Sequence, residues 1–107
     1  MMEVKMNSQE IQSLVEQHTC VLFMKGSKDM PQCGFSHHAV MLLRQYCEDF
    51  EAVDVLKDPE LRQNLKEFSD WPTFPQLYIN GEFIGGVDIM REMHDAAELK
   101  ALFTQEA

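Results

Sequence analysis

The chain contains little cysteine, glycine or proline. It has three cysteines, and no two of them are spaced as C-x-x-C. So small and odd a number excludes a secreted disulfide scaffold, and the missing C-x-x-C pair excludes a zinc ribbon or a dithiol redox motif. Five glycines and four prolines in 107 residues exclude collagen and disordered low-complexity sequence. Any cysteine chemistry must therefore rest on single thiols.

Basic residues and long apolar runs are also scarce. Lys and Arg number 9 against 18 Asp and Glu, which gives a formal net charge of −9 at pH 7. This sign opposes binding to nucleic acid through counterion release, so we expect no nucleic-acid partner. The longest apolar runs, such as residues 21–24, fall far short of the roughly 20 residues that span a bilayer. Since the first residues match neither a signal peptide nor a transit peptide, we expect a cytoplasmic protein without membrane association.

The composition that is present fits one globular domain. Hydrophobic residues make up 45% of the chain and charged residues 25%. A chain of 107 residues lies within the usual size of one domain, about 100–150 residues. We therefore expect a single domain over residues 1–107, with residues 1–7 flexible.

The hydrophobic pattern predicts alternating helices and strands. Asn7 and Glu10 have capping-box spacing ahead of a helix over 8–17, and the apolar run 20–24 predicts a strand covered on both faces. A loop at 26–31, a helix at 33–47 and a strand at 50–56 follow. The next predicted helix starts at Pro59, is capped by Asp58 and buries Leu61, Leu65 and Phe68. The last predicted elements are a hairpin at 77–84 around Asn80-Gly81 and a helix capped by Asp88. This order predicts an α/β fold with a parallel strand pair joined by a right-handed crossover, a hairpin that extends the sheet, and helices on its faces.

Cys33 lies where the predicted loop meets the predicted helix. The unpaired N–H groups and the dipole at a helix start stabilise a thiolate, and Lys25 and Lys28 add positive charge nearby in sequence. We therefore predict a reactive thiol of lowered pKa, against the alternative of an inert buried cysteine. Cys20 and Cys47 fall on predicted apolar faces, so we expect them to be core thiols.

The residues around this cysteine resemble the monothiol glutaredoxins. Cys33-Gly34-Phe35-Ser36 is the CGFS signature of that family. The other matching segments, in the same order and spacing, are Phe23-Met24-Lys25-Gly26, Pro31, Trp71-Pro72-Thr73-Phe74-Pro75-Gln76-Leu77 and Gly85-Gly86-Val87-Asp88. The resemblance spans residues 8–104 and implies a thioredoxin-like fold of the glutaredoxin type, with a four-stranded mixed sheet flanked by helices. Ser36 stands where dithiol relatives carry a second cysteine, so an internal C-x-x-C disulfide cannot form.

The resemblance also implies a glutathione site beside Cys33. The matching positions are Lys25, Arg62, Phe74, Val87 and Asp88. Lys25 and Arg62 would pair with the glycyl carboxylate of the tripeptide. Phe74 would present its backbone, because the proline that follows it is cis in that family. The N–H groups of Val87 and Asp88 would receive the γ-glutamyl carboxylate, and the Asp88 side chain would meet the ammonium group.

Two further groups near these positions leave alternatives open. Lys66, one helical turn beyond Arg62, either assists at the carboxylate or belongs to a solvated charged face. His37 and His38 follow Cys33 at spacings that zinc ligands use, but two ligands do not complete a site, so we expect an exposed pair.

The resemblance implies a function in iron-sulfur cluster assembly and transfer and in iron homeostasis. A homodimer would hold a 2Fe-2S cluster through two Cys33 thiolates and two glutathione thiolates, which supply the four thiolates that such a cluster needs. Iron-sulfur apoproteins would receive the cluster, and a BolA-type protein is a possible partner. Because each chain carries −9, we expect a monomeric apo form. The alternative function is a glutathione-dependent thiol–disulfide oxidoreductase that removes glutathione from protein thiols. A non-catalytic adaptor is a third hypothesis, which would leave the pattern of cations, glycines and acid unexplained.

Overall fold

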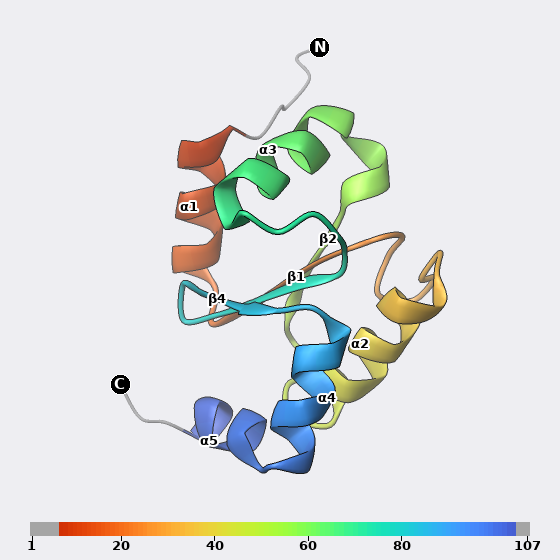
Figure 1. Ribbon diagram of the computed structural model, residues 1–107, viewed down its shortest axis with the longest axis vertical. Helices are drawn as coiled ribbons and strands as arrows, with labels where there is room; N and C mark the ends of the chain where they lie inside the picture. Colours follow the sequence, from red (N-terminus) through yellow and green to blue (C-terminus); the bar gives the residue numbers. More distant parts are fainter. Residues whose placement is uncertain (1–6, 105–107) are drawn as a thin grey trace.

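The computed structural model describes residues 7–104, which fold around one four-stranded sheet with strand order β2-β1-β3-β4 (Figure 1). In chain order the elements are α1 (Ser8–Gln17), β1 (Cys20–Met24), α2 (Gly34–Arg44), β2 (Glu51–Asp54), the 3-10 helix η1 (Val55–Lys57), α3 (Pro59–Ser69), β3 (Gln76–Ile79), β4 (Glu82–Gly85), α4 (Val87–Asp95) and α5 (Glu98–Thr104). Strand β1 is parallel to β2 and antiparallel to β3, and β3 is antiparallel to β4. The mixed sheet of the thioredoxin-like fold is therefore confirmed. Of the residues expected to be flexible, 1–6 lie outside the described residues, and Asn7 caps α1.

Helices cover both faces of the sheet. In Figure 1, α1 and α3 lie on one side of it, and α2, α4 and α5 lie on the other. All five residues of β1 are buried, and they alternate between the two faces. One core cluster joins α2, α4 and α5 to the sheet through Cys20, Leu22, Met24, Ala39, Val40, Leu42, Leu43, Phe50, Leu77, Ile79, Met90 and Leu99. The other joins α1 and α3 through Ile11, Val15, Val21, Phe23, Val55, Leu61, Leu65, Phe74 and Tyr78. Burying each large apolar side chain contributes about 1.5–3 kcal/mol, so both helical layers are held mainly by this packing.

Local sequence signals for helix starts and turns are confirmed at three places. Asn7 and Glu10 form the reciprocal capping box of α1. The Asp58 carboxylate accepts hydrogen bonds from the first turn of α3, ahead of the proline at position N1. Asn80 and Gly81 turn the β3–β4 hairpin with φ angles of 53° and 82°, as a type I′ turn requires.

Two predicted elements are shorter than their apolar patterns indicated. Helix α2 ends at Arg44 instead of residue 47, although Tyr46 and Cys47 still pack against the core. Strand β2 ends at Asp54 instead of residue 56, because the Asp54 carboxylate accepts a hydrogen bond from Leu56 N–H at 2.9 Å and starts the 3-10 turn η1. In both cases the chain stays on the core after its regular hydrogen bonding has ended.

The sequence prediction for the last helix was wrong in two respects, its first residue and the number of helices. Helix α4 begins at Val87 with Gly86 as its N-cap, so Asp88 lies inside the first turn and does not cap it. The apolar pattern also runs through a break between α4 and α5, where Ala97 adopts a left-handed φ of 63°. Ala97 is exposed and does not contribute to the core.

The loop between β1 and α2 is anchored at several points. Gly26 and Pro31 form an isolated β-bridge, and the Asp54 carboxylate accepts a hydrogen bond from Gly26 N–H at 3.0 Å. The Arg44 guanidinium lies 3.1 Å from the Asp29 carboxylate, which ties the loop to the end of α2. The loop is thus held to both β2 and α2, and it delivers Cys33 to the start of α2. Within residues 7–104, no helix has the length and apolar character to cross a membrane.

Candidate functional site

Cys33 is the N-cap residue of α2, in extended conformation. Its Sγ atom accepts a hydrogen bond from the backbone N–H of Ser36 at 3.3 Å. Its carbonyl oxygen accepts the first bond of the helix, from His37 N–H at 3.0 Å. The side chain is half-buried, so the sulfur is both held by the helix start and reachable from solvent.

The surroundings of Cys33 favour its thiolate. Burial by itself raises the pKa of the thiol, but hydrogen bonds from Ser36 and Phe35 and the positive charge of Lys25 outweigh burial, so the pKa lies below its ordinary value. The expected contribution of Lys28 was wrong. Its ammonium donates to the Glu48 carbonyl at 3.0 Å and lies 4.1 Å from the centre of the Phe50 ring, because the loop directs it along the edge of β2.

The other two cysteines occupy different environments. Cys20, on β1, is 2% exposed, and burial, with a smaller contribution from Cys47, raises the pKa of its thiol to about 12. Cys47 is half-buried at the edge of the same core cluster. All three cysteines are free thiols. Cys33 is thus distinguished by a helix start that stabilises its ionised form.

A pocket of about 450 Å³ opens beside this helix start. Its lining residues come from the position directly after β1, from α2, from α3, from the segment before β3 and from α4, and they are Lys25, Phe35, Arg62, Pro72, Thr73, Phe74 and Asp88. A second pocket of about 230 Å³ shares three of these residues and is lined by Trp71, Thr73, Phe74, Pro75, Gly86, Val87, Asp88 and Ile89. The two pockets are therefore neighbours, and together they are called the depression.

The five predicted glutathione positions all line this depression. Lys25 and Arg62 lie in the first pocket, Val87 lies in the second, and Phe74 and Asp88 border both. Cys33 lines neither pocket itself, although its neighbour Phe35 lines the first. Lys66, which is half-buried on α3, lines neither pocket.

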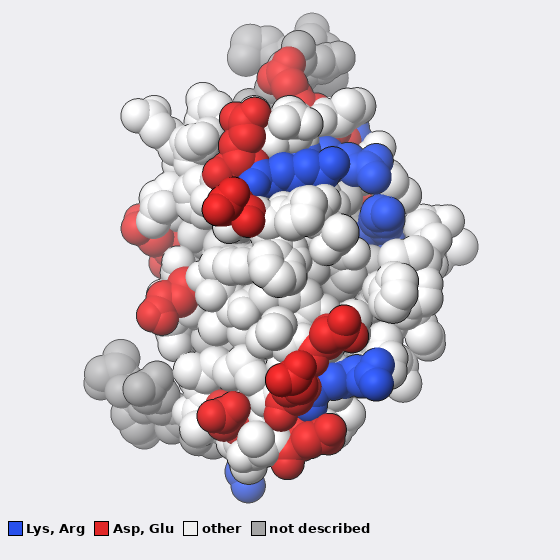
Figure 2. Space-filling view, in the orientation of Figure 1, with Lys and Arg blue, Asp and Glu red and all other residues white. Residues whose placement is uncertain are grey.

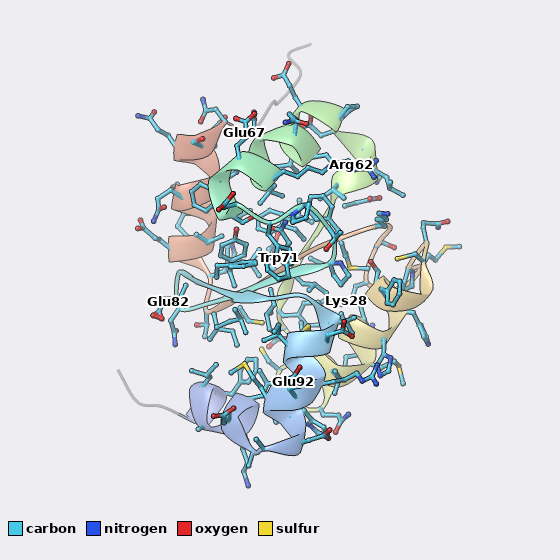
Figure 3. All side chains as sticks on the ribbon, viewed as in Figure 1. Lys28, Arg62, Glu67, Trp71, Glu82 and Glu92 are labelled. Carbon is cyan, nitrogen blue, oxygen red and sulfur yellow. The ribbon has the colours of Figure 1, made fainter. Side chains whose placement is uncertain are left out.

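The depression has a basic side and an uncapped helix start. The buried Nε atom of Arg62 has no hydrogen-bond partner among residues 7–104. At the other side, the N-cap of α4 is Gly86, so no side chain caps the N–H groups of Val87 and Asp88. In Figure 2, Lys and Arg side chains cross α3 beside acidic ones, mostly acidic side chains follow α4, and the area between them is largely uncharged. Figure 3 shows Arg62 on α3 and Glu92 on α4, with Trp71 between them.

The segment from Trp71 to Gln76, which separates the basic side of the depression from the start of α4, is held by hydrogen bonds. The Phe74–Pro75 peptide bond is cis, as the resemblance implied. Gln76 is fully buried, and its side-chain amide donates to the carbonyls of Trp71 and Thr73, at 3.1 Å each. Sequence reasoning did not assign this role to Gln76. The sequence feature that could have indicated this role was a long polar side chain at the start of a buried strand.

Two other regions do not join the site. His37 and His38 are exposed, and no three His, Cys, Asp or Glu side chains among the described residues are grouped to hold a metal ion. A larger groove of about 650 Å³ runs along β2, between the 26–31 loop and the start of α3, and it contains none of the predicted site residues.

Comparisons with known proteins agree with the resemblance to the glutaredoxins. The family model described as Glutaredoxin matches residues 20–84. The chain is 50% identical over 106 residues to a protein of Rickettsia typhi named "Probable monothiol glutaredoxin 2", covering 99% of this chain and 95% of that one. The solution structure of reduced apo GrxS14 from poplar has a TM-score of 0.76 and 52% identity, covering 86% of this chain and 84% of that chain. A buckwheat glutaredoxin–glutathione complex shares the fold, with a TM-score of 0.80 and 24% identity over 91% of this chain and 86% of that chain.

Proposed function

The chain belongs to the glutaredoxin family, among its monothiol members, and from this premise we propose that it binds glutathione beside Cys33 and carries a 2Fe-2S cluster between two copies of itself. The cluster is cargo, which the protein delivers to iron-sulfur apoproteins, and in this way it contributes to iron homeostasis. The single observation that carries the proposal is the depression next to Cys33, whose lining brings together Lys25, Arg62 and the uncapped start of α4.

Glutathione fits the two ends of this depression. Its glycyl carboxylate pairs with Lys25 and Arg62, whose unpartnered Nε atom supports an anionic ligand there. Its γ-glutamyl carboxylate meets the N–H groups at the start of α4, and its ammonium meets Asp88. Between them, the backbone of Phe74 pairs with the main chain of the tripeptide. A glutathione held in this way directs its thiol toward Cys33.

The number of available thiolates requires a second copy of the chain. A 2Fe-2S cluster takes four thiolate ligands. Each chain offers one thiol beside the site, that of Cys33, because Cys20 is buried in the core and Cys47 packs at the edge of the core. Two Cys33 thiolates and two glutathione thiolates complete the set. We further propose that a BolA-type protein can replace one copy of the chain. We also propose a cytoplasmic location, where thiols stay reduced.

Anaerobic reconstitution with iron, sulfide and glutathione tests the cluster. We expect visible charge-transfer bands with about one cluster per two chains in the wild type, and none without glutathione or in Cys33→Ser. Cys47→Ser is the matched control, since it removes a half-buried thiol outside the site, and it should retain the bands. Equal cluster content in wild type and Cys33→Ser would refute the proposal.

The lowered pKa and partial exposure of Cys33 favour one alternative, a deglutathionylating oxidoreductase. In that reaction the Cys33 thiolate attacks the glutathione sulfur of a mixed disulfide, and the protein thiolate leaves. A second glutathione thiolate then attacks the Cys33–glutathione disulfide, which regenerates Cys33 and forms oxidised glutathione. Rapid turnover of a glutathionylated peptide by a protein that assembles no cluster would establish this alternative in place of cluster transfer.

A further inference from the structure

Gln76 occupies a position that is unfavourable for a polar side chain. It is fully buried at the first residue of β3, which lies between β1 and β4 in the sheet. It stands opposite Phe23 of β1, so the sheet fixes the point from which its side chain extends. Its Oε1 atom is buried and has no hydrogen-bond partner among residues 7–104. Because an unsatisfied buried acceptor lowers stability, packing alone does not account for an amide at this position.

The N–H groups of this amide hold the 71–75 segment, which leads into β3. The Gln76 Nε2 atom donates to the carbonyl oxygens of Trp71 and Thr73, at 3.1 Å each. The segment forms neither helix nor strand, and its two prolines have no N–H to donate. Trp71 N–H bonds to the Lys66 carbonyl at 3.2 Å, which ties the start of the segment to α3. Beyond that start, the Gln76 amide connects the segment to the sheet.

The 71–75 segment belongs to the glutathione site of the proposed function, on which this inference rests. Thr73 and Phe74 line both pockets of the depression, and Trp71 lines the second. The Phe74 backbone is the part that would pair with the main chain of the tripeptide. A ligand that meets an already ordered segment avoids the entropy cost of ordering it on binding. The hydrogen bonds of Gln76 thus bear on affinity, although its side chain lines neither pocket.

We propose that Gln76 is a positioning residue that holds the 71–75 segment in its glutathione-binding conformation before the ligand arrives. Because its Oε1 atom has no partner, the same amide lowers the stability of the fold. Removing the amide should therefore separate two quantities that the loss of a purely structural residue would lower together. These quantities are the affinity for glutathione and the free energy of unfolding.

Gln76→Met tests this role, because methionine is an unbranched side chain of similar size without a donor. Trp71 and Thr73 are exposed, so their carbonyls can bond to water once the amide is gone. On the ¹⁵N-labelled apo protein without iron, an NMR titration with reduced glutathione should give an affinity about five- to tenfold weaker than that of the wild type. Urea unfolding of the same variant should have a midpoint equal to that of the wild type or higher.

The order of the 71–75 segment is measured on the same samples. Backbone ¹⁵N order parameters of Trp71, Thr73 and Phe74 should be about 0.85 in the free wild type, fall toward about 0.6 in free Gln76→Met, and recover when glutathione is added. Loss of a purely structural residue would not give this recovery. The wild type tests the proposal even if the variant fails to fold. Low order parameters in the free wild type that rise on binding glutathione would overturn it.

Gln63→Met is the matched control. Gln63 Nε2 donates to Glu67 at 3.2 Å, but between exposed side chains of α3, so its loss should leave the affinity and the order parameters unchanged. The inference is wrong if Gln76→Met binds glutathione as tightly as the wild type, or if its urea midpoint falls along with its affinity. In both cases the wild type still binds glutathione and the proposed function stands. A wild type that binds no glutathione would refute the proposed glutathione site and this inference with it.

Discussion

At the scale of single residues, the site depends on which cations reach the thiol and its pocket. Four basic side chains lie near Cys33 in sequence or on the neighbouring helix. Lys25 and Arg62 line the pocket, whereas Lys28 lies over Phe50 and Lys66 is outside the lining. An exposed charge that is not directed into the site contributes little to it, because dissolved salt at about 0.1 M screens exposed charges that lie more than about 10 Å apart. The two pairs should therefore contribute very differently to ligand binding.

Arg62→Ala is expected to weaken glutathione binding by roughly ten- to a hundredfold, because a hydrogen bond to a charged group is worth about 1.5–3 kcal/mol. Titration calorimetry of the apo protein with reduced glutathione measures this. Lys66→Ala is the control, since it removes a cation from the same helix without altering the pocket lining. A loss of affinity in Lys66→Ala as large as in Arg62→Ala would contradict this assignment.

At the scale of elements, the loop between β1 and α2 determines where the helix start is held. Gly26 begins this loop with a φ of 93°, in the region that favours glycine. A Cβ atom built there would lie 2.5 Å from the Met30 carbonyl oxygen and 2.6 Å from the Gln32 nitrogen. Backbone surrounds this position, so the neighbours cannot move away without opening the loop.

Gly26→Ala should therefore lower the free energy of unfolding by about 2 kcal/mol or more, through strain at positive φ and the backbone clash. Gly34→Ala is the matched control, because a Cβ atom at Gly34 meets nothing within 4 Å. Urea unfolding followed by circular dichroism gives both values. If the two variants lose equal stability, the loop is not packed against Gly26 as described.

At the scale of the whole molecule, charge and burial set how the protein responds to salt and pH. The net charge of −9 opposes close approach of two copies, and the repulsion between exposed charges is screened by salt. The core, in contrast, holds groups that ionise only at high pH. Burial raises the pKa of Cys20 from 9.0 to about 12 and that of Tyr78 from 10.0 to about 12.

The apo protein is expected to be monomeric at low salt and micromolar concentration, and to dimerise when the cluster and glutathione are bound. Analytical ultracentrifugation of the apo and reconstituted forms distinguishes the two states. Raising the salt concentration should favour the reconstituted dimer, because it screens the repulsion. A stable apo dimer at low salt would contradict the prediction.

Stability is expected to fall as the pH rises from about 9 toward 12. The Cys20 thiol ionises in the unfolded chain near its ordinary pKa of 9.0, but in the folded protein only near 12. A folded pKa above the unfolded one gives stability that is complete below pH 9 and lost through this window, by at most about 1.4 kcal/mol per pH unit for one group. Urea unfolding between pH 7 and 11 measures the slope, which should become shallower in Cys20→Ala. An unchanged slope would mean that Cys20 is not protected by burial.

Much of the site could be predicted from short stretches of sequence. The capping box at Asn7, the Asp58 cap, the Asn80-Gly81 turn and Cys33 at a helix start all depend on hydrogen bonds between residues a few positions apart. Such bonds form in the same way wherever the segment lies in the fold. The positions carried over by family resemblance likewise fall around one depression.

What the sequence alone determined, then, is the order of the α-helices and strands from α1 to β4, the mixed sheet and the thiol at the start of α2. Only the tertiary structure decided which side chains meet across elements. It directed Lys28 away from Cys33 to Phe50, joined Ser36 to Lys25, and used Gln76 to hold the carbonyls of Trp71 and Thr73. It also ended α2 and β2 earlier than their apolar patterns. Apolar periodicity reports contact with the core, whereas these outcomes depend on distances between segments far apart in the chain, which are set only when the helices pack on the sheet.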